Sequence, residues 1–125
     1  MQGVVIVDHG SKQADSNRLL EEVVRAFTNG NGDRFPIVEP AHMELAEPTI
    51  AQAYDACVAR GAVEIVVSPF FLGPGRHWTE DIPALIAAAA SKHPHTTWKL
   101  APPLGNHPLI QHLLLQRIRE ALGEA

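Results

Sequence analysis

Hydrophobic residues gather in four short runs that are typical of buried β-strands. The runs are residues 4–7, 35–43, 63–67 and 96–100. The first is an unbroken stretch of valine and isoleucine that ends at Asp8, as expected of a strand that reaches a loop. The second is the weakest candidate, because Pro36 and Pro40 interrupt it.

Segments with apolar residues at helical spacing separate and follow these runs. They cover residues 19–27, 48–61, 78–91 and a last stretch in which Leu109, Ile110, Leu113, Leu114, Arg117 and Ile118 carry the pattern. The run 29–33 ends the first helix, and Pro48 opens the second, which Gly61 closes. Four alternations of strand and helix predict a flavodoxin-like three-layer α/β domain, with a four-stranded parallel sheet and helices on both faces.

Composition places the whole chain, residues 1–125, in one domain. Hydrophobic residues make up 46% and charged residues 19%, which is enough for a core and too little charge for a disordered tail. The single cysteine, Cys57, excludes an internal disulfide framework and fits a reducing compartment. No apolar stretch is long enough to span a membrane, and residues 1–7 are typical of a first strand rather than of a signal peptide. We therefore expect a cytoplasmic protein, or a plastid stromal one if a transit peptide has been removed.

The charge balance argues against a nucleic-acid partner. The net charge of −4 comes from the first half of the chain, where five basic and nine acidic residues precede Val63. Binding to a phosphate backbone needs clustered Lys and Arg, which this sequence lacks.

Histidines follow several of the predicted strands and suggest a metal site. Ligands of such folds bind beyond the carboxyl ends of the strands, and His9, His42, His77 and His107 are all expected near that edge. His9 and His77 follow neighbouring strands, and Glu44 adds a carboxylate from a third strand end. Two imidazoles and one carboxylate suit Fe, Co, Ni or Zn. The alternatives are a His9 satisfied by local hydrogen bonds and a Glu44 that is a solvated loop charge. The other three histidines are expected on the surface.

Two other motifs have little support. Asp8-His9-Gly10-Ser11 contains an acid, a base and a nucleophile, but adjacent residues of a strand point to opposite faces and are poorly placed for a catalytic triad. Gly73-Pro74-Gly75 lacks the Lys-Ser/Thr pair of a phosphate-binding loop. Acyl transfer and nucleotide binding are therefore poor hypotheses.

Residues around the His77 loop offer contacts for a flat ligand with carboxylates. Phe71, Leu72 and Trp78 are candidates for an apolar wall, and Arg76 and Lys12 are candidates to pair with carboxylates. The alternative for the aromatic residues is core packing, and for the two basic residues it is solvated surface.

Taken together, these motifs resemble a known family. They are Asp8-His9-Gly10-Ser11, residues 39–48, residues 68–72, Gly75-Arg76-His77-Trp78, Asp81-Ile82-Pro83 and Pro103-Leu104-Gly105. The combination covers nearly the whole chain and resembles the short class II tetrapyrrole chelatases, the sirohydrochlorin chelatases of the CbiX/SirB type.

The resemblance implies insertion of Fe²⁺ into sirohydrochlorin to form siroheme. His9, Glu44 and His77 occupy the positions of the family's metal-handling residues, and the metal ion is a substrate. In this hypothesis the neutral histidines hold the ion, and Glu44 or a histidine accepts the pyrrole protons. The same ligands would serve the cobaltochelatase of cobalamin synthesis, which is the alternative within enzymes. A non-catalytic metal- or tetrapyrrole-binding protein and an interaction domain with incidental histidines are the alternatives outside enzymes.

The resemblance also implies a homodimer, because longer relatives fuse two such units around one cleft and a single chain supplies half of it. Lys12, Phe71, Leu72, Arg76 and Trp78 are then expected to contact the tetrapyrrole. No iron–sulfur cluster is expected, because the sequence ends before the cysteine-bearing tail of plant relatives.

Overall fold

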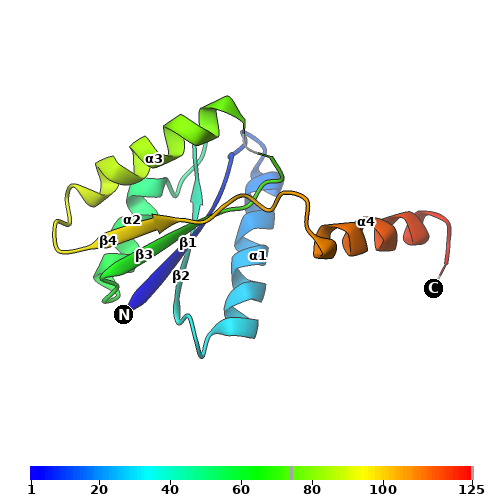
Figure 1. Ribbon diagram of the computed structural model, residues 1–125, viewed down its shortest axis with the longest axis horizontal. Helices are drawn as coiled ribbons and strands as arrows, with labels where there is room; N and C mark the ends of the chain where they lie inside the picture. Colours follow the sequence, from blue (N-terminus) through cyan, green and yellow to red (C-terminus); the bar gives the residue numbers. More distant parts are fainter. Residues whose placement is uncertain (74, 125) are drawn as a thin grey trace.

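The computed structural model describes residues 1–73 and 75–124, without the side chains of residues 76–78. Strands and helices alternate along the chain (Figure 1). The elements are β1 (Gln2–Asp8), α1 (Ala14–Asn31), β2 (Ile37–His42), α2 (Ile50–Ala59), β3 (Glu64–Pro69), α3 (Arg76–Ala90), β4 (Thr97–Leu100) and α4 (Pro108–Ala121).

The four strands form one parallel sheet in the order β2-β1-β3-β4. β1 therefore lies between β2 and β3, and Asp8 is in register with His42 of β2. This order makes the boundary between β1 and β3 the point where the chain changes direction across the sheet, which is where ligands of such folds bind. The predicted fold class is confirmed.

Helices cover both faces of the sheet, and β1 supplies core residues to each. Val5 and Val7 face a core shared with α2 and α3, where Tyr54 and Ile86 are fully buried. Val4 and Ile6 face a smaller core on α1, which contributes Leu20 and Val24. The alternation along one strand thus builds two cores.

Local signals account for most element boundaries. Thr49 caps α2 through a capping box with Gln52, and Gly61 follows that helix at φ +104°. Pro40 is tolerated within β2 because β2 is an edge strand, where a missing N–H leaves no ladder position unpaired. The start of α3 at Arg76 is two residues earlier than the sequence pattern predicts.

The last helix differs from the expectation of a layered domain. α4 has no buried residue and projects away from the sheet (Figure 1). His107 caps it, since His107 Nδ1 accepts a hydrogen bond from the Leu109 N–H at 3.1 Å. The N-terminus of the helix is capped, but none of its apolar residues belongs to either core of the described chain. Among the described residues, no helix is long and apolar enough to cross a membrane.

Candidate functional site

His9 and Glu44 meet at the carboxyl edge of the sheet. His9 directly follows β1, and Glu44 lies two residues after β2. His9 Nε2 is 3.3 Å from Glu44 Oε1, and each side chain is 51% exposed. An imidazole and a carboxylate are thus held together while both still face solvent. The structure brings these two predicted residues together, and their role as metal ligands stays a prediction.

The backbones of the two loops are in direct contact. The Met43 N–H donates to the Asp8 carbonyl at 2.9 Å, and the Glu44 N–H donates to the His9 carbonyl at 3.2 Å. Gly10 has φ +90°, and a Cβ at this position would lie 1.9 Å from the Glu44 carbonyl oxygen. Only glycine allows this approach. The spacing of His9 and Glu44 is therefore set by main-chain contacts as well as by their side chains.

A second histidine–carboxylate pair joins the last residues of β1 and β2, from which the loops of the first pair begin. His42 Nδ1 is 2.6 Å from Asp8 Oδ1, and His42 is only 1% exposed. Because a carboxylate accepts hydrogen bonds, this contact fits the imidazole tautomer that has its proton on Nδ1. The buried Nε2 has no hydrogen-bond partner among the residues that the structure describes.

The sequence predicts His42 at this edge, but the pattern does not predict its pairing with Asp8. The pairing follows from the parallel register, which places the last residues of β1 and β2 side by side. His9 directly follows Asp8, and Glu44 lies two residues after His42. The buried Asp8–His42 pair therefore joins the two strand ends from which His9 and Glu44 extend.

His77 lies at the start of α3. α3 begins at Arg76 with Gly75 as N-cap, after the loop that leaves β3 at the carboxyl edge. The side chains of Arg76, His77 and Trp78 lie outside the described residues, so the predicted meeting of His77 with His9 stays a prediction. Within the described part of the chain, no three His, Cys, Asp or Glu side chains group closely enough to hold a metal ion.

The candidate ligand-contact residues differ in exposure. Leu72 is 60% exposed, and Lys12 is exposed after β1. Phe71 is half-buried, packs against the larger core and lines an apolar pocket of about 140 Å³ with Ile82 and Leu100. The structure thus leaves Leu72 and Lys12 open to a ligand and places Phe71 mainly in packing.

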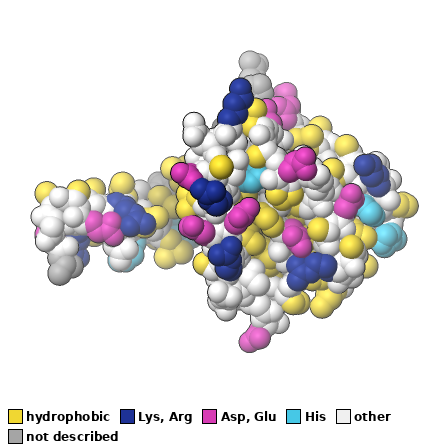
Figure 2. All heavy atoms as spheres, turned by 180° about the vertical axis from the view of Figure 1, so that it is seen from behind, with side chains coloured by type: hydrophobic (Ala, Val, Ile, Leu, Met, Phe, Trp, Pro, Cys, Tyr) yellow, Lys and Arg dark blue, Asp and Glu magenta, His cyan; other side chains and the backbone are white. Residues whose placement is uncertain are grey.

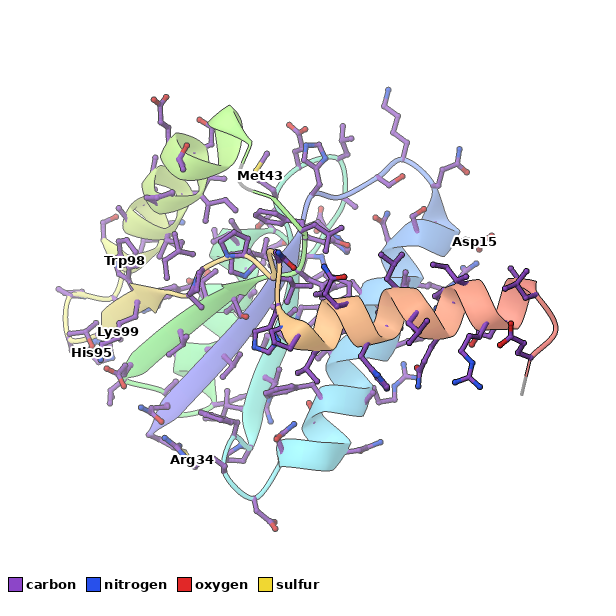
Figure 3. All side chains as sticks on the ribbon, turned by 45° about the vertical axis from the view of Figure 1, so that its right-hand side comes forward. Asp15, Arg34, Met43, His95, Trp98 and Lys99 are labelled. Carbon is purple, nitrogen blue, oxygen red and sulfur yellow. The ribbon has the colours of Figure 1, made fainter. Side chains whose placement is uncertain are left out.

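An open hollow lies beside Glu44. It measures about 380 Å³ and is lined by Met43, Glu44, Asp81, Ala84 and Leu85. Figure 3 labels Met43 near the start of α3 and His95 at the far end of the sheet. Asp81 belongs to one of the motifs quoted for the family resemblance, but the sequence pattern does not predict that it lies near Glu44. It reaches the hollow because α3, which begins at Arg76, packs beside the loop after β2.

The remaining histidines are mostly outside this site. His107 caps α4, and His95 and His112 are exposed as expected. His93 is half-buried instead: its Nε2 lies 2.7 Å from Asp55 Oδ1, and its ring stacks on Tyr54. It supports the packing of α2 against the segment before β4.

Known proteins resemble the chain over nearly its full length. The chain is 51% identical over 121 residues to a chloroplastic sirohydrochlorin ferrochelatase of Arabidopsis thaliana, matching 97% of this chain and 53% of that protein. It is 33% identical to a sirohydrochlorin cobaltochelatase of Methanopyrus kandleri, with 99% of both chains matched. The chain thus spans about half the length of the plant relative and the whole of the archaeal one.

Two solved structures have a similar fold. A putative cobalamin biosynthesis CbiX protein of Marinobacter aquaeolei superposes with a TM-score of 0.81 at 27% identity over 98% of both chains. SirB of Bacillus subtilis, solved with Fe³⁺, gives a TM-score of 0.81 at 30% identity, covering 96% of this chain and 47% of that one. The CbiX family model matches residues 3–121, so the chain that holds His9 against Glu44 belongs to the CbiX family.

Proposed function

We propose that this protein inserts a divalent metal ion, with Fe²⁺ favoured, into sirohydrochlorin. The observation that carries the proposal is the His9–Glu44 pair, 3.3 Å apart and half-exposed at the carboxyl edge. Imidazole and carboxylate together suit Fe²⁺ and Co²⁺. The 51% identity to a plant sirohydrochlorin ferrochelatase supports iron as the metal.

The mechanism follows from what these groups do chemically. His9 and, in the proposal, His77 hold the incoming ion as neutral imidazoles and leave positions for pyrrole nitrogens. The macrocycle loses two N–H protons as the ion enters. One dipositive ion replaces two protons, so the total charge of the macrocycle and its metal stays the same. In the proposal Glu44 accepts a pyrrole proton, which is supported by its 51% exposure, because an exposed carboxylate can pass a proton on to bulk water.

Substrate binding needs apolar contacts and cations. The hollow beside Glu44 provides Met43, Ala84 and Leu85 as an apolar floor. At about 380 Å³ it is near the lower end of ligand pockets, and it is open. One chain therefore offers one wall for a large macrocycle, which supports a homodimer with the second wall on a partner copy. Lys12, Arg76, Leu72 and Trp78 are the proposed contacts to the ring and its carboxylates, with Phe71 behind them.

A cobaltochelatase is the second candidate. The observation in its favour is the Methanopyrus kandleri sirohydrochlorin cobaltochelatase, which matches this chain end to end. The ligand set discriminates poorly between the two ions, so the relative insertion rates and the metal supply decide which ion the protein inserts. Plastid stroma and cytoplasm are both compatible with this function, and the plant relative favours the plastid.

The test is anaerobic absorbance of sirohydrochlorin mixed with Fe²⁺ or Co²⁺, with and without the protein. We expect insertion faster than the protein-free rate, lost in His9→Ala and Glu44→Gln. His95→Ala is the matched control, because His95 is exposed at the opposite edge of the sheet (Figure 3). No acceleration with either ion would reject the enzyme and favour a non-catalytic binding protein.

A further inference from the structure

Leu45, the residue after Glu44, has an unusual backbone conformation. Among the residues that the structure describes, it is the only one other than glycine with a positive φ, which is +70°. In this left-handed region the Cβ of a leucine lies close to the following carbonyl oxygen, whereas glycine and asparagine are tolerated more easily. The fold therefore keeps a leucine at a position where its side chain costs stability.

The Leu45 side chain gains little from the rest of the described chain. It is 55% exposed and belongs to neither of the two cores. Single exposed apolar residues are common on proteins, and Figure 2 shows hydrophobic side chains scattered among charged ones on one face of the molecule. Exposure alone therefore does not distinguish Leu45. Its combination with an unfavourable backbone does, because such conformations concentrate at functional sites.

The loop that carries Leu45 is held by main-chain hydrogen bonds. The His42 N–H donates to the Pro48 carbonyl at 2.8 Å, which closes the loop between these two residues. Within it, the Glu44 N–H donates to the His9 carbonyl at 3.2 Å. A loop that is fixed before a ligand arrives loses little conformational entropy on binding. Leu45 is thus an exposed apolar residue on a preorganised loop.

Leu45 and Leu72 lie on loops at either side of the strand end that carries His9. Leu45 is three residues after the end of β2, and Leu72, which is 60% exposed, is three residues after the end of β3. β1 lies between these strands and ends beside His9. Neighbouring strands are about 4.8 Å apart, so the ends of β2 and β3 are separated by about 10 Å. This separation is comparable to the width of a flat macrocycle of four pyrrole rings.

We propose that Leu45 binds the tetrapyrrole by packing against its apolar ring, next to the position of the metal ion. The inference rests on the proposed function and adds to it a contact residue that the sequence pattern does not predict. Glu44 and Leu45 are consecutive, so one fixed loop offers a carboxylate to the metal position and an apolar side chain to the ring. Leu45 therefore contributes to the affinity for the macrocycle and not to the affinity for the ion.

Two other roles would also keep a leucine at this position. If Leu45 packs the loop, its removal lowers the free energy of unfolding and disturbs Glu44. If Leu45 faces a second copy of the chain, its removal changes the assembly state. Neither role predicts a loss that is confined to tetrapyrrole binding, so measurements of stability, metal binding and mass distinguish both from the proposed contact.

The experiment measures binding of metal-free sirohydrochlorin to the full chain and to three variants by fluorescence titration. Leu45→Asn removes the apolar side chain and keeps a residue that tolerates φ +70°. Leu45→Met keeps an apolar side chain of similar volume. Val63→Asn is the matched control, because Val63 is 48% exposed at the opposite edge of the sheet, directly before β3. We expect the dissociation constant to rise about tenfold in Leu45→Asn, as for the loss of a leucine contact, and to stay unchanged in the other two.

Three further measurements on Leu45→Asn test the alternative roles. Its affinity for Co²⁺ should equal that of the wild type, because His9 and Glu44 keep their contact. Its free energy of unfolding should not fall, because asparagine fits a left-handed backbone better than leucine. Sedimentation velocity should give both proteins the same mass. A loss of stability together with Co²⁺ binding would overturn the proposal in favour of loop packing, and a change of mass would overturn it in favour of an interface.

Failure of this contact and failure of the proposed function give different results. Equal dissociation constants for sirohydrochlorin in the wild type and Leu45→Asn would overturn the contact and leave metal insertion intact. A wild type that binds sirohydrochlorin through Leu45 but does not accelerate metal insertion would support the contact and reject the enzyme. A wild type that does not bind sirohydrochlorin would reject both.

Discussion

Asp8 Oδ1 lies 2.6 Å from His42 Nδ1, and this contact joins the carboxyl ends of two neighbouring strands. His42 is 1% exposed, so its imidazole is held in the protein with one carboxylate partner. The pair lies where β1 and β2 end and where the loops that carry His9 and Glu44 begin. Its effect on the site is therefore positional: it holds two strand ends in register beneath the exposed pair.

Asp8→Asn should destabilise the protein measurably. The substitution removes a charge-assisted hydrogen bond to a buried group, which costs about 1 to 3 kcal/mol. Urea unfolding measures this loss. Asp55→Asn is the matched control, because Asp55 forms a contact of similar length, 2.7 Å, to His93 but is 50% exposed. It should cost less than about 1 kcal/mol, and equal losses in the two variants would contradict a special role for the buried pair.

Gly10→Ala should disturb the candidate site through the backbone. Gly10 has φ +90°, and an added Cβ would overlap the Glu44 carbonyl oxygen. Gly61→Ala separates the two causes, because Gly61 has φ +104° with nothing within 4 Å of its Cβ position. We expect about 1 kcal/mol of destabilisation for Gly61→Ala and clearly more for Gly10→Ala.

The comparison is made by denaturant unfolding of both variants under the same conditions. Metal binding supplies a second measurement, since only Gly10→Ala should alter the spacing of His9 and Glu44. If the two variants lose the same stability and bind metal equally, close contact of the loops has no role in the site.

The sequence predicts the layered sheet well because the signals are local. The runs at residues 4–7 and 63–67 contain most of the residues that β1 and β3 bury, and Gly3 and Pro69 are buried just outside them. The placement of His9 and Glu44 at neighbouring strand ends follows from topology alone. Contacts between residues far apart in the sequence are harder to predict from it. The Asp8–His42 pair depends on strand register, and Asp81 reaches the hollow beside Glu44 only through the packing of α3.

The position of α4 could not be read from its pattern. Amphipathic spacing predicts that a helix needs an apolar neighbour, but it does not say which chain supplies it. The hydrogen bonds of Leu104 and Gly105 decide the direction in which α4 leaves, and these depend on the loop after β3.

Glu44→Gln should weaken metal binding, while Glu47→Gln should not. Glu44 contacts His9, whereas Glu47, three residues along the same loop, accepts a hydrogen bond from Gln52 at 3.0 Å. Loss of a carboxylate that binds or orients at a metal site costs about tenfold or more in affinity. Titration with Co²⁺, followed by its visible absorption bands, measures both variants. Equal affinities would remove Glu44 from the metal site.

Cys57 should make the stability of the fold depend on alkaline pH. Burial raises the pKa of Cys57 from 9.0 to about 12, with a smaller contribution from Glu39 and an opposing one from Arg60. The thiol is fully buried against β1, where only its neutral form is favoured. Between these two pH values the unfolded chain releases a proton that the folded chain keeps. The free energy of unfolding therefore falls as pH rises above 9, by up to about 1.4 kcal/mol per pH unit.

Cys57→Ala removes this titration and leaves all other ionisable groups in place. Urea unfolding of both proteins at neutral pH and at about one unit above the ordinary thiol pKa separates the contribution of Cys57 from that of tyrosine and lysine. Below the ordinary pKa the two proteins should differ by a constant amount, which reflects the lost packing of the sulfur. Above it, wild type should lose stability faster than the variant. Parallel curves over the whole range would mean that the thiol ionises in the folded protein as readily as in the unfolded chain, and that the interior at β1 and α2 admits water.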